Sequence, residues 1–305
     1  MAKLGKWGQI FLKNVSQVIL LENIWAGVLI LIALWIGNWK VGLAAMIGSA
    51  LSMLTAKYFN YSDEEIQSGL AGFNSVLIAI DLTLFLEWSW QALLIIILSI
   101  ILSMPTAQAI KSFLRPLNLP ELTMPFVIIT WIVLLMSEQF KFIKTNVNVL
   151  PLTTNFKVDL DTPFKPIQAF LENLSQIFLV EHMLAGLLII IACFVASRHV
   201  GICVILANIL GLIFEFILGA DIATINHGLF GFNLILAIIA IGHTFKSQNH
   251  LNPIVAFILT VLMTPMAYAA LATFFDPIGI PILTFPFILV TWTLLLAGQP
   301  KQQTN

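Results

Sequence analysis

Charge is scarce in this sequence. Only 10% of the 305 residues are charged and the formal net charge is −1, with no basic stripe and no acidic tail. Proteins that bind DNA or RNA neutralise phosphates with clustered Lys and Arg side chains. The scarcity of charge therefore excludes a nucleic-acid partner.

Signatures of catalysis and of metal or cofactor binding are also missing. The chain has two cysteines, Cys193 and Cys203, both in apolar stretches without a second ligand at metal-binding spacing, so we interpret them as small core residues. The sequence contains no glycine loop of the phosphate-binding kind and no nucleophile elbow. It predicts neither an enzyme nor a cofactor or metal site.

Apolar residues are abundant instead. They make up 59% of the chain and the mean hydropathy is +0.99. Several apolar runs are long enough to cross a bilayer, for which a helix needs about 20 residues. The sequence therefore predicts an all-α integral membrane protein that crosses the membrane several times.

The sequence contains an internal repeat. Three blocks occur twice in the same order, about 160 residues apart, which indicates duplicated halves. We assign residues 1–139 to the first half, 140–172 to a connector loop and 173–305 to the second half. The paired blocks are NVSQVILLENIWAGVLILIA (from Asn14) with NLSQIFLVEHMLAGLLIIIA (from Asn173), GLAGFNSVLIAI (from Gly69) with GLFGFNLILAII (from Gly228), and LPELTMPF (from Leu119) with IPILTFPF (from Ile280).

Each half is predicted to cross the membrane five times. An odd number of crossings inserts the second copy upside down, so the halves form inverted repeats about a pseudo-two-fold axis in the membrane plane. With both termini in the cytoplasm, nine of the fourteen Lys and Arg residues fall on the inner side, which favours this orientation. In the first half, a short amphipathic piece at 14–22 precedes apolar runs at 24–38, 41–57, 70–86, 91–113 and 122–137.

The two proline-containing octamers break helices inside apolar runs. The segments that follow them are too short to cross alone, so we expect re-entrant half-helices. Pro125 and Pro286 have no N–H for the carbonyl four residues earlier, which leaves two carbonyls without a helical donor. A proline at an ordinary helix start is the alternative, against which the duplication argues. The expected polar groups are the carbonyls of Glu121 and Ile282 and the hydroxyls of Thr123 and Thr284.

The other two blocks contain paired residues one helical turn apart, which therefore share a face. The glycine-rich blocks place an aromatic ring beside an aliphatic side chain, and core packing or close helix approach are the alternative interpretations. The first blocks place a glutamine beside a leucine, and a buried glutamine requires a partner or a permeating ligand. The pairs are Phe73 with Leu77, Phe232 with Leu236, Gln17 with Leu20, and Gln176 with Leu179.

The blocks resemble the signature of the urea transporter family, in particular its bacterial urea channels. The octamer with Thr and Pro-Phe and the glycine-rich block with an aromatic residue and Asn carry the likeness, which covers residues 14–299 in order. The resemblance implies a homotrimer in the plasma (inner) membrane, in contact with lipid. It further implies one pore per protomer at the pseudo-two-fold interface and passive, channel-like conduction of urea.

The resemblance also implies roles for the paired residues. The Phe and Leu pairs would form flat apolar slots, the glutamines would meet urea at these slots, and the threonines would line the constriction between them. The implied substrate-binding residues are Gln17, Phe73, Leu77, Thr123, Gln176, Phe232, Leu236 and Thr284, and the implied pore-lining residues are Leu20, Leu179, Glu121 and Ile282.

The chemistry of urea agrees with such a passage. Urea is flat and neutral, with four N–H donors and one carbonyl, so an apolar slot with oxygens along one edge replaces its lost water. An ion-coupled secondary transporter of a small polar amide is the alternative, but coupling requires a titratable group inside the membrane and the matched positions offer Gln and Thr. A membrane scaffold without flux is a third possibility.

Three acidic residues receive individual expectations. Asp81 is expected at the solvated end of a span. Glu215 has Ala56 as its repeat mate, so we expect a local interhelical bond rather than a symmetric function. Glu121 has Ile282 as its mate, which indicates that the carbonyl of Glu121, not its carboxylate, belongs to the repeated feature.

Overall fold

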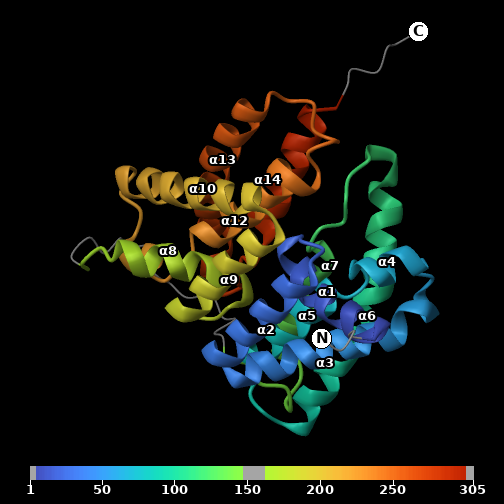
Figure 1. Ribbon diagram of the computed structural model, residues 1–305. Helices are drawn as coiled ribbons and strands as arrows, with labels where there is room; N and C mark the ends of the chain where they lie inside the picture. The colour runs from blue at the N-terminus through green and yellow to red at the C-terminus, as the bar shows by residue number, and fades with distance from the viewer. Residues whose placement is uncertain (1–4, 147–161, 300–305) are drawn as a thin grey trace.

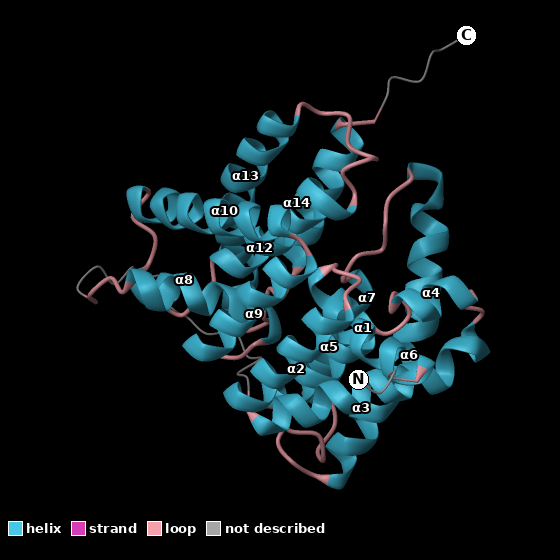
Figure 2. Ribbon diagram, viewed as in Figure 1, coloured by secondary structure: helices cyan, strands magenta, loops and turns pink. Residues whose placement is uncertain are grey.

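The fold is helical throughout the part of the chain that the structure describes. The computed structural model describes residues 5–146 and 162–299. Within these residues, one isolated antiparallel β-bridge joins Leu86 and Thr145. Figure 1 shows the helices packed in two neighbouring groups, coloured blue to green and yellow to red, and Figure 2 shows the same helices in cyan. The prediction of an all-α membrane protein is confirmed.

The helices follow the same order in the two halves. The first half comprises α1 (Lys6–Ser16), α2 (Ile24–Gly37), α3 (Trp39–Thr55), α4 (Asp63–Ser68), α5 (Phe73–Phe85), α6 (Trp90–Leu114) and α7 (Met124–Ser137). The second half comprises α8 (Pro166–Ser175), α9 (Met183–Ala196), α10 (Arg198–Ile217), α11 (Ile222–Asn226), α12 (Gly231–Ile239), α13 (Pro253–Phe275) and α14 (Phe285–Ala297). Short 3₁₀ turns lie at η1 (Gln17–Ile19), η2 (Ala56–Phe59), η3 (Arg115–Leu117), η4 (Gln176–Phe178) and η6 (Asp276–Ile278), and η5 (Ala240–Thr244) is a π-helix.

The backbone repeats as closely as the sequence. Every described residue with a positive φ has a repeat mate that also has one. Two of these pairs are leucines, for which the left-handed conformation is strained because the side chain crowds the backbone. The pairs are Leu20 with Leu179, Asn60 with Gly219, Gly69 with Gly228, Asn118 with Gly279, and Leu122 with Leu283.

Several helix boundaries differ from the sequence-based expectations. The amphipathic piece expected at 14–22 contains the last three residues of a longer helix, α1, which begins at Lys6, then the 3₁₀ turn η1 and a non-helical stretch. Its mate α8 begins at Pro166, inside the expected connector, while residues 147–161 of that connector lie outside the described residues. The run at 70–86 forms a shorter helix, α5, because Gly69 adopts φ +83° and separates α4 from α5.

The helix lengths bear on how the chain crosses a membrane. Four helical segments are long and apolar enough to cross alone, and two bent pairs, α1 with α2 (75°) and α8 with α9 (77°), raise the total to six if each pair is one span. The helices α5, α7, α12 and α14 are shorter, and at 1.5 Å per residue 13 residues cover about 20 Å. Five crossings per half therefore stay a prediction. The four long segments are Trp39–Phe59, Trp90–Leu117, Arg198–Ile217 and Pro253–Ile278.

The two halves meet through mated helices. Helix α2 packs along its mate α9, which brings the fully buried Ile30 and Ile189 into one hydrophobic cluster. The indole N–H of Trp131 on α7 donates to the carbonyl of Pro281 at 2.8 Å, and the indole N–H of its mate Trp292 donates to the carbonyl of Pro120 at 2.9 Å. Reciprocal contacts of this kind are what a two-fold axis between two copies produces.

We predict that Trp131→Phe destabilises the contact between the halves. Phenylalanine keeps one aromatic ring but loses the pyrrole ring with its N–H, which leaves the Pro281 carbonyl without its donor at a cost of about 1–2 kcal/mol. The melting temperature of the protein in detergent should fall by about 2–4 °C. Trp90→Phe serves as the control because Trp90 is 72% exposed, and an equal shift in both variants would contradict the prediction.

Candidate functional site

Two mated threonines meet where the halves join. Thr123 precedes α7 and Thr284 precedes α14, and their hydroxyl oxygens lie 2.6 Å apart in a hydrogen bond. Both side chains are buried. The residues that the octamers predict to face one another are thus in direct contact, although they lie 161 positions apart in the chain.

Two asparagine side chains bind backbone groups that have no helical partner at the starts of α7 and α14. The amide of Asn74 donates to the carbonyl of Leu122 at 3.1 Å and accepts from the N–H of Phe126 at 3.2 Å. Its mate Asn233 bonds the carbonyl of Leu283 at 3.2 Å and the N–H of Phe287 at 3.1 Å. In a regular helix these N–H and carbonyl groups would bond each other, so each side-chain amide is inserted into one missing helical bond.

The carbonyls expected to lack a partner have one. The carbonyl of Glu121 accepts from the N–H of Met124 at 3.2 Å, and that of Ile282 accepts from the N–H of Phe285 at 3.3 Å. The intervening Leu122 turns left-handed, with φ 50°, which closes a tight turn just before α7. The expectation of unbonded carbonyls is therefore wrong, because the chain bends to replace the bond that proline removes.

The carboxylate of Glu121 also has a specific partner. The ammonium of Lys111 on α6 lies 3.3 Å from the carboxylate of Glu121 and 2.6 Å from that of Glu65. This ion pair helps to hold α6 against the octamer, and it has no counterpart in the second half, where Ile282 takes the place of Glu121.

The paired aromatic and aliphatic residues are buried beside the threonines. Phe73 and Leu77 lie on α5, Phe232 and Leu236 lie on α12, and all four are at most 5% exposed. The same hydrophobic cluster contains Leu20, Leu122 and Leu283. The structure therefore brings the two Phe and Leu pairs together in one continuous apolar region.

The two glutamines are buried with different partners. The amide of Gln17 donates to the carbonyl of Ser68 at 3.0 Å, whereas that of Gln176 lies 3.4 Å from the carboxylate of Glu181. Each glutamine stands three residues before a left-handed leucine, Leu20 or Leu179, at the end of its 3₁₀ turn. The glutamines therefore occupy equivalent places with unequal hydrogen bonding.

The charges around the glutamines also differ between the halves. In the first half the ammonium of Lys13 pairs with the carboxylate of Glu22 at 2.6 Å. In the second half the imidazole of His227 lies 3.6 Å from the carboxylate of Glu181 and 3.9 Å from that of Glu172. The two ends of the site are therefore chemically distinct despite the repeat.

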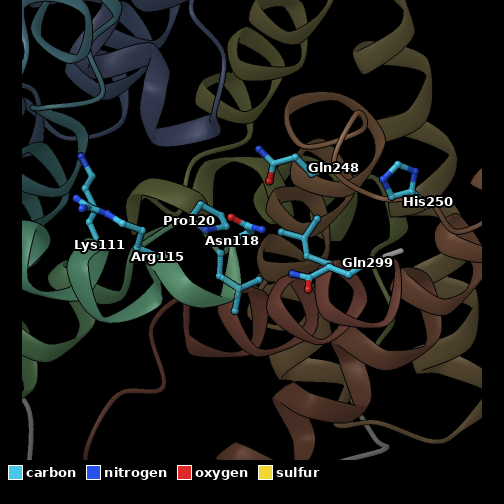
Figure 3. Close-up of a pocket in the computed structure, with 9 residues that line it drawn as sticks. Lys111, Arg115, Asn118, Pro120, Gln248, His250 and Gln299 are labelled. Carbon is cyan, nitrogen blue, oxygen red and sulfur yellow. The ribbon is translucent and has the colours of Figure 1, made fainter. Parts of the chain in front are cut away.

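A cavity of about 700 Å³ opens beside the first octamer. Figure 3 shows Pro120 and Asn118 at its centre, Lys111 and Arg115 on one side, and Gln248, Gln299 and His250 on the other. The amide of Gln299 donates to the carbonyl of Leu117 at 2.6 Å and so joins the two halves at this cavity. Polar groups thus lead from the surface to the octamer.

Comparison with known proteins decides the family. The family model described as "Urea transporter" matches residues 9–299. The chain belongs to the urea transporter family. Among curated relatives of this urea transporter, Urea transporter 1 of Ovis aries and that of Capra hircus are each 28% identical over 295 residues, and that of Mus musculus is 26% identical over 294 residues. Each alignment covers 93% of this chain and 75% of the relative.

Family membership settles the broad class of the protein. A urea transporter is a multi-pass membrane protein that carries out transport and is not an enzyme. Passive urea transport agrees with the family, whereas the ion-coupled alternative receives no support from it. The resemblance that the sequence motifs indicate is confirmed.

Sequence reasoning missed the polar residues next to the predicted site. Asn74 and Asn233 stand in both copies of the glycine-rich block, so their duplication was the available signal. Asp81 was expected at a solvated span end but is 1% exposed on α5, one turn beyond Leu77, and neither of its carboxylate oxygens has a hydrogen-bond partner. Burial at this position depends on the neighbouring helices α3 and α6, which pack against α5.

We predict that Asn74→Leu strongly destabilises this urea transporter. The substitution leaves the buried N–H of Phe126 and carbonyl of Leu122 without partners, at about 1–3 kcal/mol for each group. The melting temperature in detergent should fall by more than about 4 °C. Unaltered melting of Asn74→Leu would show that other groups satisfy the break.

Proposed function

We propose that the protein is a passive, channel-like urea pathway that runs along the contact between its two halves. The observation that carries the proposal is the hydrogen bond between the Thr123 and Thr284 hydroxyls. These hydroxyls can donate and accept, so they can exchange their mutual bond for bonds to a urea molecule. An apolar region with a pair of exchangeable hydroxyls suits a small neutral solute that must move on quickly.

The buried Phe and Leu pairs supply the slots on either side of the threonines. Phe73 with Leu77 on α5 and Phe232 with Leu236 on α12 present flat apolar surfaces, which fit the faces of a planar molecule. Urea retains its hydrogen bonds at its edges while its faces lose water at low cost. In this proposal Gln17 and Gln176 meet the urea N–H and carbonyl groups, and Leu20, Leu179, Glu121 and Ile282 line the path.

The eight proposed substrate-binding residues carry no charge. An ion that entered between them would lose its hydration without a counter-charge, which is far more costly than for a neutral amide. The part of the path that these eight residues form therefore selects against ions without a dedicated barrier. The cavity beside Pro120 serves as its vestibule in this proposal.

We further propose that the protein acts as a homotrimer in the plasma (inner) membrane, with both termini in the cytoplasm. The support is the distribution of Lys and Arg across the expected loops and the family resemblance. Chemical cross-linking in native membranes tests the trimer. Accessibility of cysteines introduced at either end tests the orientation, and extracellular labelling of both ends would overturn it.

The experiment that tests the function is stopped-flow urea permeation in proteoliposomes. We expect urea to enter down its gradient at a rate that is independent of imposed proton and sodium gradients. Urea flux that depends on a proton or sodium gradient would show that transport is ion-coupled and not passive. Urea entry no faster than in protein-free liposomes would contradict the proposal that the protein transports urea.

We predict that Thr123→Val or Thr284→Val slows urea flux about fivefold. Each substitution keeps the shape but removes one hydroxyl, and a lost hydrogen bond of about 1 kcal/mol corresponds to that factor. Thr123→Ser should retain most of the flux. Thr106→Val is the control, because the partly buried Thr106 donates to the carbonyl of Leu102 in its own helix. Full flux in both site variants would show that the threonines do not line the constriction.

We predict that Phe73→Ala and Phe232→Ala weaken discrimination between urea and longer amides. Loss of one ring widens the slot, so the permeability ratio of urea to a methylated urea should fall severalfold. The measurement is permeation of both solutes in the same proteoliposomes. An unchanged ratio in both variants would indicate that the rings serve core packing alone.

A further inference from the structure

Among the described residues of the second half, one buried carboxylate has no hydrogen-bond partner for either of its oxygens. This carboxylate belongs to Glu215 on α10, a residue that is 2% exposed. The interhelical bond expected from the sequence is therefore absent from the described residues. A carboxylate without a partner is costly inside a membrane protein, so Glu215 requires a further explanation.

Glu215 lines a cavity of about 790 Å³ between α10, α11 and α13. Asp276 lies at its exposed rim, and Asp221 also lines it while accepting bonds from Thr224. Phe230 and Tyr268 form a ring pair in its wall, with centroids 4.5 Å apart. The described lining residues include these three acidic side chains and no Lys, Arg or His.

The first half holds an ammonium group in the matching region. The ammonium of Lys111 lies 2.6 Å from the carboxylate of Glu65, 3.3 Å from that of Glu121 and 4.7 Å from the centre of the Tyr61 ring. Burial alone would raise the pKa of Glu65, but the hydrogen bonds from Lys111 and Ser62 lower it. Carboxylates and an aromatic ring thus surround one cation of the protein itself.

The second half has no counterpart of that cation. Lys111 lies between two prolines that have mates in the second half. If the halves are aligned on Pro105 and Pro265, the residue equivalent to Lys111 is Leu271, and if they are aligned on Pro116 and Pro277, it is Ala272. Neither carries a charge. The cavity that Glu215 lines nevertheless has a carboxylate and aromatic rings, namely Glu215, Phe230 and Tyr268. These residues are not the repeat mates of Glu65, Glu121 and Tyr61.

We propose that this cavity binds a small ammonium cation, either ammonium itself or a short primary alkylammonium, with the carboxylate of Glu215 as its counter-ion. The bound cation takes the place that the side chain of Lys111 occupies in the first half. Its N–H groups donate to Glu215, the face of Tyr268 or Phe230 attracts its charge, and Asp276 at the rim favours entry. The site is separate from the proposed urea path, whose residues do not line this cavity.

The test is the melting temperature of the purified full chain in detergent with methylammonium chloride. A ligand that binds only the folded protein stabilises it, and tenfold excess over the dissociation constant should raise the melting temperature by about 2–4 °C. Sodium chloride and tetramethylammonium chloride at equal concentration are the reference salts, because neither cation has an N–H donor. Equal shifts with all three salts would overturn the proposal.

Variants locate the binding. Glu215→Gln should lose at least three quarters of the methylammonium shift, whereas Glu64→Gln, on an exposed carboxylate of α4, should retain it. Ala272→Lys supplies an internal ammonium to the cavity and should likewise abolish the shift. A full shift in Glu215→Gln would overturn the proposal.

Infrared difference spectroscopy of the unmodified protein gives a second readout that needs no variant to fold. Methylammonium should convert a protonated carboxyl band to an ionised one if Glu215 is neutral in its absence, or shift an ionised band if it is not. A spectrum without any carboxyl change would overturn the proposal. Urea flux measured in parallel separates this site from the urea path, since Glu215→Gln should leave flux unchanged.

Discussion

The structure depends on pairing the backbone groups where helices break inside an apolar interior. Hydrocarbon offers no water to an unpaired N–H or carbonyl, so a break survives only where protein atoms replace the missing bond. Asn74 and Asn233 do this because a side-chain amide both donates and accepts, and each bridges one carbonyl and one N–H at the start of α7 or α14. With the break satisfied, Thr123 and Thr284 meet between the halves.

A repeated backbone supports unequal chemistry in the two halves. The positive-φ residues recur in pairs and the mated tryptophans bind reciprocally, so the backbone is nearly symmetric. Individual residues nevertheless differ, since Lys13 in the first half corresponds to Glu172 in the second. The helices differ as well: α5 is α-helical along its whole length, whereas α12 is followed by the π-helix η5. The hydroxyl of Thr244 in η5 donates to the carbonyl of Leu20 at 3.1 Å. Symmetry of the backbone therefore sets the positions, and the individual side chains set the properties of each end.

The predictions succeeded where the physical cause is local. Hydropathy, the duplicated blocks and the family signature indicated an all-α urea transporter, and the prolines marked where α7 and α14 start. The prediction of unbonded carbonyls at Glu121 and Ile282 was wrong because proline shows which helical bond is lost, not which atom replaces it. The roles proposed for Gln17 and Gln176 stay predictions, although their burial agrees with a place inside the protein.

The sequence by itself determined the membrane class and the positions of the helix breaks, because each depends on neighbours within a few residues, and it determined the duplication, because the two copies can be compared letter by letter. Tertiary structure decided the rest. The bond between Trp131 and Pro281 joins residues 150 positions apart, and the burial of Asp81 and Glu215 depends on helices that pack across them. Such contacts depend on how helices pack in three dimensions, and no pattern along one segment reports which distant atoms will meet.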